Sequence, residues 1–319
     1  MGRILVGGIA SILMCAFLCP SFIRAQRRRE FGQQIREDGP GGHHVKAGTP
    51  TMGGVVIMAT VFIAFAFVTE GEWRSAIVLA TSGGCGLLGL VDDYLKLKRR
   101  RSLGLRWWTK LVGTGFIATG LWLAATRGAH VSTNLWVPLL AVHIELGPLY
   151  PLALYVVLAG TTSAVNLTDG LDGLAAGCVA IVLSAYVAIA FSLGEYDLAV
   201  LGGCLVGACW GFLWFNAFPA TIFMGDTGSL GLGGAIATFA IMTNTELLLP
   251  LLGAIFVIEA FSVMLQVASY RLTGRRIFLM APIHHHFELS GLSETKIIIR
   301  FWIVTAVSTA IGFAIFHHG

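Results

Sequence analysis

Residues 173–192 read GLAAGCVAIVLSAYVAIAFS, a stretch without a single charged side chain. A membrane-spanning helix needs about 20 mostly apolar residues, so this stretch predicts one. Comparable windows fall near 4–23, 53–69, 75–91, 108–126, 149–166, 198–215, 228–244, 247–270 and 297–316. The runs are continuous and lack the alternation of a membrane barrel strand. We therefore expect an all-α, polytopic membrane protein with about ten transmembrane helices.

The composition agrees with this prediction. Of 319 residues, 56% are hydrophobic and only 12% are charged, and the mean hydropathy is +0.79. A soluble domain carries roughly 25% charged residues, so a large soluble core is excluded. The first apolar run lacks a small-residue cleavage site and is expected to be a span rather than a signal peptide. We expect one transmembrane domain over residues 1–319, with all six cysteines as small buried hydrophobic residues.

Basic residues predict the orientation of the chain. All Lys and Arg residues except Arg3, Arg74 and Arg127 lie in or beside the loops after the first, third and ninth windows. Loops rich in Lys and Arg are cytoplasmic, so both termini are expected on the periplasmic or outer face. Orientation and contact with anionic headgroups explain these runs better than nucleic-acid binding does. The outward loop 128–147 is too short to span, and we expect a hairpin or interfacial segment at 135–144.

Five polar clusters interrupt the apolar chain, and each falls in a predicted cytoplasmic loop. They occupy residues 46–51, 92–96, 166–172, 216–226 and 284–286. Ionisable groups near hydrocarbon are costly unless they face a wet cavity or a partner. We therefore expect the clusters to converge on one site at the cytoplasmic membrane surface.

Two of the clusters carry carboxylates with more than one explanation. Asp92 and Asp93 end the third window and Lys96 follows one turn later, which suits either a helix-end salt bridge or a site for proton abstraction. Asp226 stands in a Gly-rich turn and could cap a helix or bind Mg²⁺.

The clusters at residues 166–172 and 284–286 differ in character. Asn166, Asp169 and Asp172 recur every third residue without a basic neighbour. Helix capping accounts for one of these carboxylates, and the rest of the cluster indicates a bound cation, sugar or base. His284, His285 and His286 are adjacent, so their side chains diverge and do not match the spacing of zinc sites. Phosphate or sugar binding is the better explanation of the triplet.

Together these segments resemble the phospho-N-acetylmuramoyl-pentapeptide transferase family. The matching stretches are residues 32–40, 46–54, 89–96, 166–175, 216–230 and 276–288, in the order of the family. The resemblance implies transfer of phospho-N-acetylmuramoyl-pentapeptide from UDP-MurNAc-pentapeptide to undecaprenyl phosphate, giving lipid I and UMP. It also implies dependence on Mg²⁺, a site on the cytoplasmic face of the bacterial inner membrane, and a homodimer.

The resemblance also implies roles for individual residues. Asp226 is expected to bind the metal, and Asp92, with Asp93 beside it, to take the proton from the lipid phosphate; all three count as catalytic. The residues expected to bind substrate are Lys46, Thr51, Lys96, Lys110, Asn166, Asp169, Asp172, Asn216, Phe223, Gln266, Ala281, His284, His285 and His286.

Three other functions are compatible with parts of the pattern. A sister transferase would use UDP-N-acetylglucosamine with the same lipid, and the histidine triplet argues against it. A secondary transporter would place its ionisable residues near mid-membrane on broken helices, often with repeat symmetry. An intramembrane aspartyl protease would need two facing Asp residues within adjacent spans, and no second Asp is available inside a predicted span.

Overall fold

The computed structural model describes residues 1–28, 48–99, 104–138, 140 and 142–318 of the chain. Every predicted apolar window overlaps a helix, which confirms the mainly helical class. The helices are α1 (Gly2–Arg28), α2 (Gly54–Val68), α3 (Trp73–Arg99), α4 (Trp107–Arg127), α5 (Tyr150–Thr168), α6 (Leu174–Ser192), α7 (Tyr196–Asn216), α8 (Gly225–Met242), α9 (Leu249–Leu252), α10 (Ala254–Thr273), α11 (Ile283–Leu289) and α12 (Glu294–His318), with a 3₁₀ turn, η2 (Gly147–Leu149), before α5.

Among the described residues, seven helices are long and apolar enough to cross a membrane. They are α1, α3, α5, α6, α7, α10 and α12. The predicted windows 53–69, 108–126 and 228–244 are also helical, as α2, α4 and α8, but these three are not among the seven. Helix α2 has only 15 residues, and α8 is rich in glycine and buried along almost its whole length. A helix that is enclosed by protein does not contact lipid and can be less apolar than a lipid-facing span. A hydropathy criterion therefore does not select α8.

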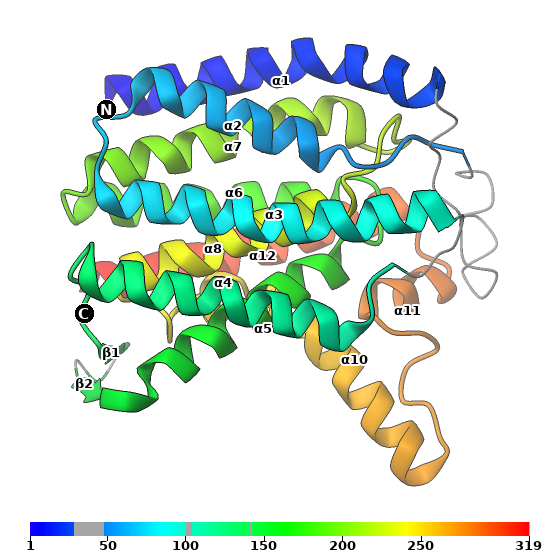
Figure 1. Cartoon of the computed structure of the whole chain (residues 1–319). Helices are drawn as coiled ribbons and strands as arrows, with labels where there is room; N and C mark the ends of the chain where they lie inside the picture. The colour runs from blue at the N-terminus through cyan, green and yellow to red at the C-terminus, as the bar shows by residue number, and fades with distance from the viewer. Residues whose placement is uncertain (29–47, 100–103, 139, 141, 319) are drawn as a thin grey trace.

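Helix α8 lies at the centre of the bundle. It contacts α2, α3, α5 and α6, and its pairing with α3 is the most extensive in the molecule. Outside this core, α1 packs on α7, α7 on α6, and α12 on α6. Helices α1 to α4 run side by side across the view in Figure 1.

The two ends of the bundle differ in what they carry. Both termini lie at one end, on the left in Figure 1, whereas the C-terminal ends of α1 and α3 and the short α11 lie at the other. Strands β1 (Asn134–Val137) and β2 (Val142–Glu145) pair antiparallel at the end of the termini, with Asn134 opposite Glu145. The hairpin expected within the outward loop is therefore present.

The ninth window is split rather than continuous. Helix α9 ends at Leu252, and Gly253 separates it from α10. The hydroxyl of Thr309 on α12 donates to the carbonyl of Leu252 at 2.8 Å, which holds the break inside the bundle. Helix α10 then leaves the bundle at an angle (Figure 1) and exposes apolar side chains such as Phe261 and Met264.

Candidate active site

Asp93 joins the C-terminal part of α3 to the start of α8. Its carboxylate accepts hydrogen bonds from the backbone N–H of Asp226 at 3.1 Å and of Thr227 at 2.9 Å, and from the Thr227 hydroxyl at 2.8 Å. The first N–H groups of a helix have no partner within the helix, and the helix dipole favours negative charge there. The oxygens of Asp93 are therefore largely used in holding α8 against α3.

The close approach of α3 to α8 depends on Gly89, one turn before Asp93. A Cβ atom at this position would lie 2.1 Å from the carbonyl oxygen of Asp226. Only glycine lets the two backbones come this close. Gly89 and Asp93 together bring Asp226 beside Asp92.

Two lysines bridge the carboxylates of Asp92 and Asp226. The ammonium nitrogen of Lys96 lies 2.7 Å from Asp92 Oδ2 and 2.8 Å from Asp226 Oδ1. Lys110, on α4, lies 3.4 Å from Asp92 Oδ1 and also pairs with Asp226. The backbone N–H of Leu105 donates to Asp92 at 2.6 Å, and Asp92 is completely buried. The two ammonium groups offset the repulsion between neighbouring carboxylates.

The donor set of this cluster fits Mg²⁺. Asp92, Asp93 and Asp226 each offer an oxygen within 4.8 Å of the other two. Mg²⁺ prefers oxygen ligands, keeps several waters, and is usually bound by one or two carboxylates together with substrate phosphates. Because Asp93 already accepts three hydrogen bonds from α8 and Asp92 accepts one from Leu105, Asp226 is the best placed of the three to hold a metal.

The segment before α2 packs against the turn that precedes α8. The N–H of Phe223 donates to the carbonyl of Pro50 at 2.8 Å, and the N–H of Gly53 donates to the carbonyl of Phe223 at 2.9 Å. Thr51 is buried, and its hydroxyl would lie 3.2 Å from a Cβ at Gly225. Thr51 and Phe223 therefore lie beside the acidic cluster, whereas Lys46 lies outside the described residues.

Asp172 and Asn216 connect the turn between α5 and α6 to the loop between α7 and α8. Asn216 accepts a hydrogen bond from the N–H of Gly173 at 3.1 Å and donates to the carbonyl of Ile222 at 2.9 Å. Asp172 accepts from the N–H of Ala220 at 2.9 Å. Both side chains fix loop geometry, and their expected role in binding substrate stays a prediction.

Asn166 and Asp169 lie at the end of α5 that faces the cluster. The Asn166 amide donates to the Ser229 hydroxyl of α8 at 2.8 Å. Asp169 is half-buried in the turn after α5. Burial raises the pKa of Asp169 to about 8, and the carboxylates of Asp226 and Asp93 add to the rise.

The three histidines of α11 have three different partners. His284 Nδ1 lies 3.0 Å from Glu259 Oε1, His285 Nδ1 lies 3.1 Å from Glu288 Oε2, and His286 Nδ1 accepts from a backbone N–H, that of Leu279, at 3.2 Å. The rings of His284 and His285 nevertheless lie together, with their centroids 4.2 Å apart, so the expected divergence is wrong for this pair. In the described ranges, the group of side chains placed to hold a metal is the acidic cluster, and the role of each histidine stays a prediction.

Gln266 fixes the loop between α10 and α11. Its side-chain oxygen accepts from the N–H groups of Ile277 at 3.0 Å and Phe278 at 2.9 Å, and its amide donates to the Phe278 carbonyl at 2.9 Å. Ala281 is half-buried just before α11. Binding of substrate by Gln266 and Ala281 stays a prediction.

Comparison with known proteins identifies the family of the chain. A family model described as Glycosyl transferase family 4 matches residues 75–244, and the Phospho-N-acetylmuramoyl-pentapeptide-transferase signature 1 matches residues 46–58. A phospho-N-acetylmuramoyl-pentapeptide-transferase of Heliobacterium modesticaldum is 50% identical and covers 92% of this chain and 91% of its own. Those of Rubrobacter xylanophilus (99% and 98% covered) and Geobacillus kaustophilus (97% and 96% covered) are each 45% identical.

The chain belongs to the phospho-N-acetylmuramoyl-pentapeptide-transferase family. The resemblance drawn from the sequence is confirmed. Membership of this family also agrees with a multi-pass membrane protein, as the apolar helices indicate.

Glu259, Ser229 and Leu105 contact expected site residues and were not predicted from the sequence. Glu259 is the acidic one. It is the one acidic residue in α10 and is completely buried against His284. A signal was present, because a carboxylate inside an apolar window points to a functional partner. Ser229 and Leu105, which contact Asn166 and Asp92, gave no such signal.

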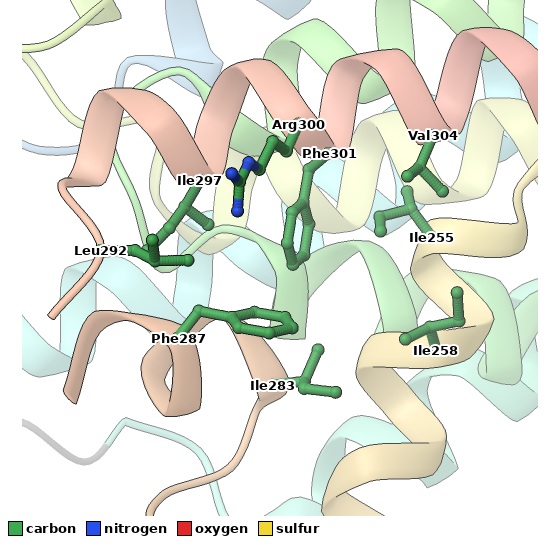
Figure 2. A pocket seen from close by; sticks show the side chains of 9 residues that line it. All are labelled: Ile255, Ile258, Ile283, Phe287, Leu292, Ile297, Arg300, Phe301 and Val304. Atoms are coloured by element: carbon green, nitrogen blue, oxygen red, sulfur yellow. The ribbon is translucent and has the colours of Figure 1, made fainter. Parts of the chain in front are cut away.

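An apolar pocket lies on another face of α11, apart from the acidic cluster. Its volume is about 260 Å³, and Figure 2 shows its lining side chains, which come from α10, α11, α12 and the turn before α12. They are Ile255, Ile258, Ile283, Phe287, Leu292, Ile297, Arg300, Phe301 and Val304. None of the clustered carboxylates lines this pocket, and Arg300 is its one charged residue.

Proposed function

We propose that this chain transfers phospho-N-acetylmuramoyl-pentapeptide from UDP-MurNAc-pentapeptide to undecaprenyl phosphate, giving lipid I and UMP. The observation that carries the proposal is the family relationship over nearly the whole chain, joined to the meeting of Asp92, Asp93 and Asp226 at one end of the bundle. One substrate is a water-soluble polyanion and the other lies in the bilayer. A site at the end of a membrane bundle is accessible to both.

The reaction is a direct displacement. Asp92 takes the proton from the lipid phosphate, and an oxygen of that phosphate attacks the phosphorus that bears the sugar. A new P–O bond forms to the lipid phosphate as the bond to the phosphate of UMP breaks, and UMP leaves. Such transfers depend mainly on positioning and on neutralising charge. Lys96 and Lys110 offset phosphate charge, and Mg²⁺ held by Asp226 would supply further charge neutralisation on the diphosphate.

The substrate would lie across the loops that surround this cluster. We assign the nucleotide and sugar phosphates to the region of Lys46, Thr51, Asn166, Asp169, Asp172, Asn216 and Phe223. The sugar-peptide side is assigned to Gln266, Ala281 and the triplet His284 to His286. This assignment is supported by the contacts that place most of these residues around one end of α8 or on α11.

The proposal includes a topology and an assembly. A single transferase domain over residues 1–319 crosses the bacterial inner membrane ten times, with the active site on the cytoplasmic face and both termini outside. Both termini lie at the end of the bundle opposite the C-terminal end of α3, and Asp92 and Asp93 belong to the C-terminal part of α3, which supports this topology. The assembly we propose is a homodimer, as the sequence resemblance implies.

Release of UMP by the purified protein tests this function. The assay supplies UDP-MurNAc-pentapeptide or UDP-N-acetylglucosamine, with and without a polyprenyl phosphate and Mg²⁺. We expect UMP only when the muramoyl donor, the lipid and Mg²⁺ are all present. If UMP were released with UDP-N-acetylglucosamine, lipid and Mg²⁺ but not with UDP-MurNAc-pentapeptide, the protein would be the sister transferase instead. A sugar-phosphate adduct trapped on Asp92 or Asp93 without lipid would contradict direct displacement.

A further inference from the structure

Helix α10 buries one carboxylate that the proposed reaction does not use. Glu259 has no exposed surface, and its Oε1 lies 3.0 Å from Nδ1 of His284, which is equally buried. A carboxylate inside an apolar helix is costly unless it has a partner that needs it. The contact joins α10 to the histidine triplet on α11.

The other ring nitrogen of His284 is directed at the turn after α5. Within the described ranges, Nε2 is buried and has no hydrogen-bond partner. A Cβ atom at Gly170 would lie only 2.3 Å from Nε2, so the ring rests against the backbone of this glycine. Asp169, the preceding residue, lies in the electrostatic field of Asp226 and Asp93. Glu259, His284 and Gly170 thus form a continuous contact from α10 to the turn after α5.

We propose that Glu259 is a positioning residue that acts through His284 on the Asp169–Gly170 turn. Glu259 accepts the Nδ1–H of His284 and fixes both the tautomer and the orientation of the ring. The ring in turn fixes the turn that we assign to the UDP-sugar donor, so the inference rests on the proposed function. A carboxylate that accepts a hydrogen bond from one imidazole nitrogen commonly determines whether the other nitrogen carries a proton.

Replacing the carboxylate by its amide tests this role. Glu259→Gln keeps the size of the side chain but weakens its preference for a protonated Nδ1. We expect kcat/KM for the UDP-sugar donor to fall about tenfold or more, with KM for polyprenyl phosphate unchanged. Glu246→Gln is the matched control, because Glu246 is also buried, at 3% exposure, but contacts Tyr150 instead. Equal losses in both variants, or a loss of folded protein alone, would show that Glu259 is merely structural.

A double-mutant cycle separates action through His284 from an independent effect. In a His284→Asn background, Glu259→Gln should cost little further donor kcat/KM, because the residue through which it acts is gone. Fully additive losses would contradict the proposal.

The protonation of His284 gives a readout that needs no turnover. In protein labelled with ¹⁵N-histidine, the His284 signal is the one missing from His284→Asn. We expect a protonated Nδ1 in the natural sequence and a changed Nδ1 signal in Glu259→Gln. A bare Nδ1, or a signal unaffected by Glu259→Gln, would overturn the inference. Absence of UMP release from the unmodified protein would instead refute the proposed function and leave the tautomer result intact.

Discussion

Asp226 and Asp93 are close in space and have different partners. Asp226 pairs with Lys96 and Lys110, whereas Asp93 accepts the N-terminal N–H groups of α8. The lysines that pair with Asp226 can move to a substrate phosphate, and a metal can then take their place. Asp93 cannot change partners without breaking the hydrogen bonds that hold α8 against α3.

Asp226→Asn tests the metal assignment. The amide keeps the shape of the side chain but removes the charge that would hold Mg²⁺, so we expect Mg²⁺-dependent UMP release to fall about 100-fold or more. The protein should still insert and unfold at nearly the normal temperature. Lys98→Ala is the comparison, because Lys98 is exposed and lies over the ring of Tyr94 rather than in the cluster. Its turnover should stay within about twofold of normal; near-normal turnover of Asp226→Asn would refute the assignment.

Asp169 makes stability depend on pH. Burial raises its pKa from 3.8 to about 8 in the folded protein, so the folded state binds this proton more tightly than the unfolded chain does. The stabilisation is fully present below the unfolded value and is lost as the pH rises through about 8. Asn at position 169 cannot ionise, so Asp169→Asn should unfold at a higher temperature than the natural sequence at pH 9, with a smaller difference at pH 5.5. Thermal unfolding in detergent measures this, and parallel pH curves would contradict the assignment.

At the scale of elements, the crossing of α3 and α8 determines whether the acidic cluster exists. In Gly89→Ala the new methyl group meets the Asp226 carbonyl, and backbone cannot move aside as a flexible side chain can. We expect a loss of about 1–3 kcal/mol in stability, together with lower UMP release. Gly160→Ala on α5 is the control, because a Cβ there meets nothing within 4 Å. Unchanged unfolding and turnover in Gly89→Ala would mean that the two helices are not held this closely.

The sequence predicts elements better than it predicts their contacts. Long apolar runs give the helices, because a membrane span must satisfy its own backbone. Hydropathy alone does not show that α8 is enclosed, and Leu249 to Leu252 continue the apolar run across the break at Gly253. The sequence shows which segments are rich in acidic residues. It does not show the hydrogen bond from the Thr227 N–H to Asp93, because that bond depends on how α3 and α8 cross.

At the scale of the whole molecule, the decisive question is which end of the bundle faces the cytoplasm. The termini lie at the end opposite the C-terminal end of α3 in Figure 1, and Asp92 and Asp93 belong to that part of α3. The basic loops predict that this end is cytoplasmic. All six natural cysteines are buried, so an impermeant maleimide reports on introduced ones. His318→Cys and Ser290→Cys place exposed thiols at the two ends. In intact cells the reagent should label His318→Cys, and it should reach Ser290→Cys only after the membrane is opened. UDP-sugars are made in the cytoplasm, so the reverse labelling pattern would place the site on the side of the membrane that lacks its donor. The proposed reaction would then be refuted, whatever the geometry around Asp226.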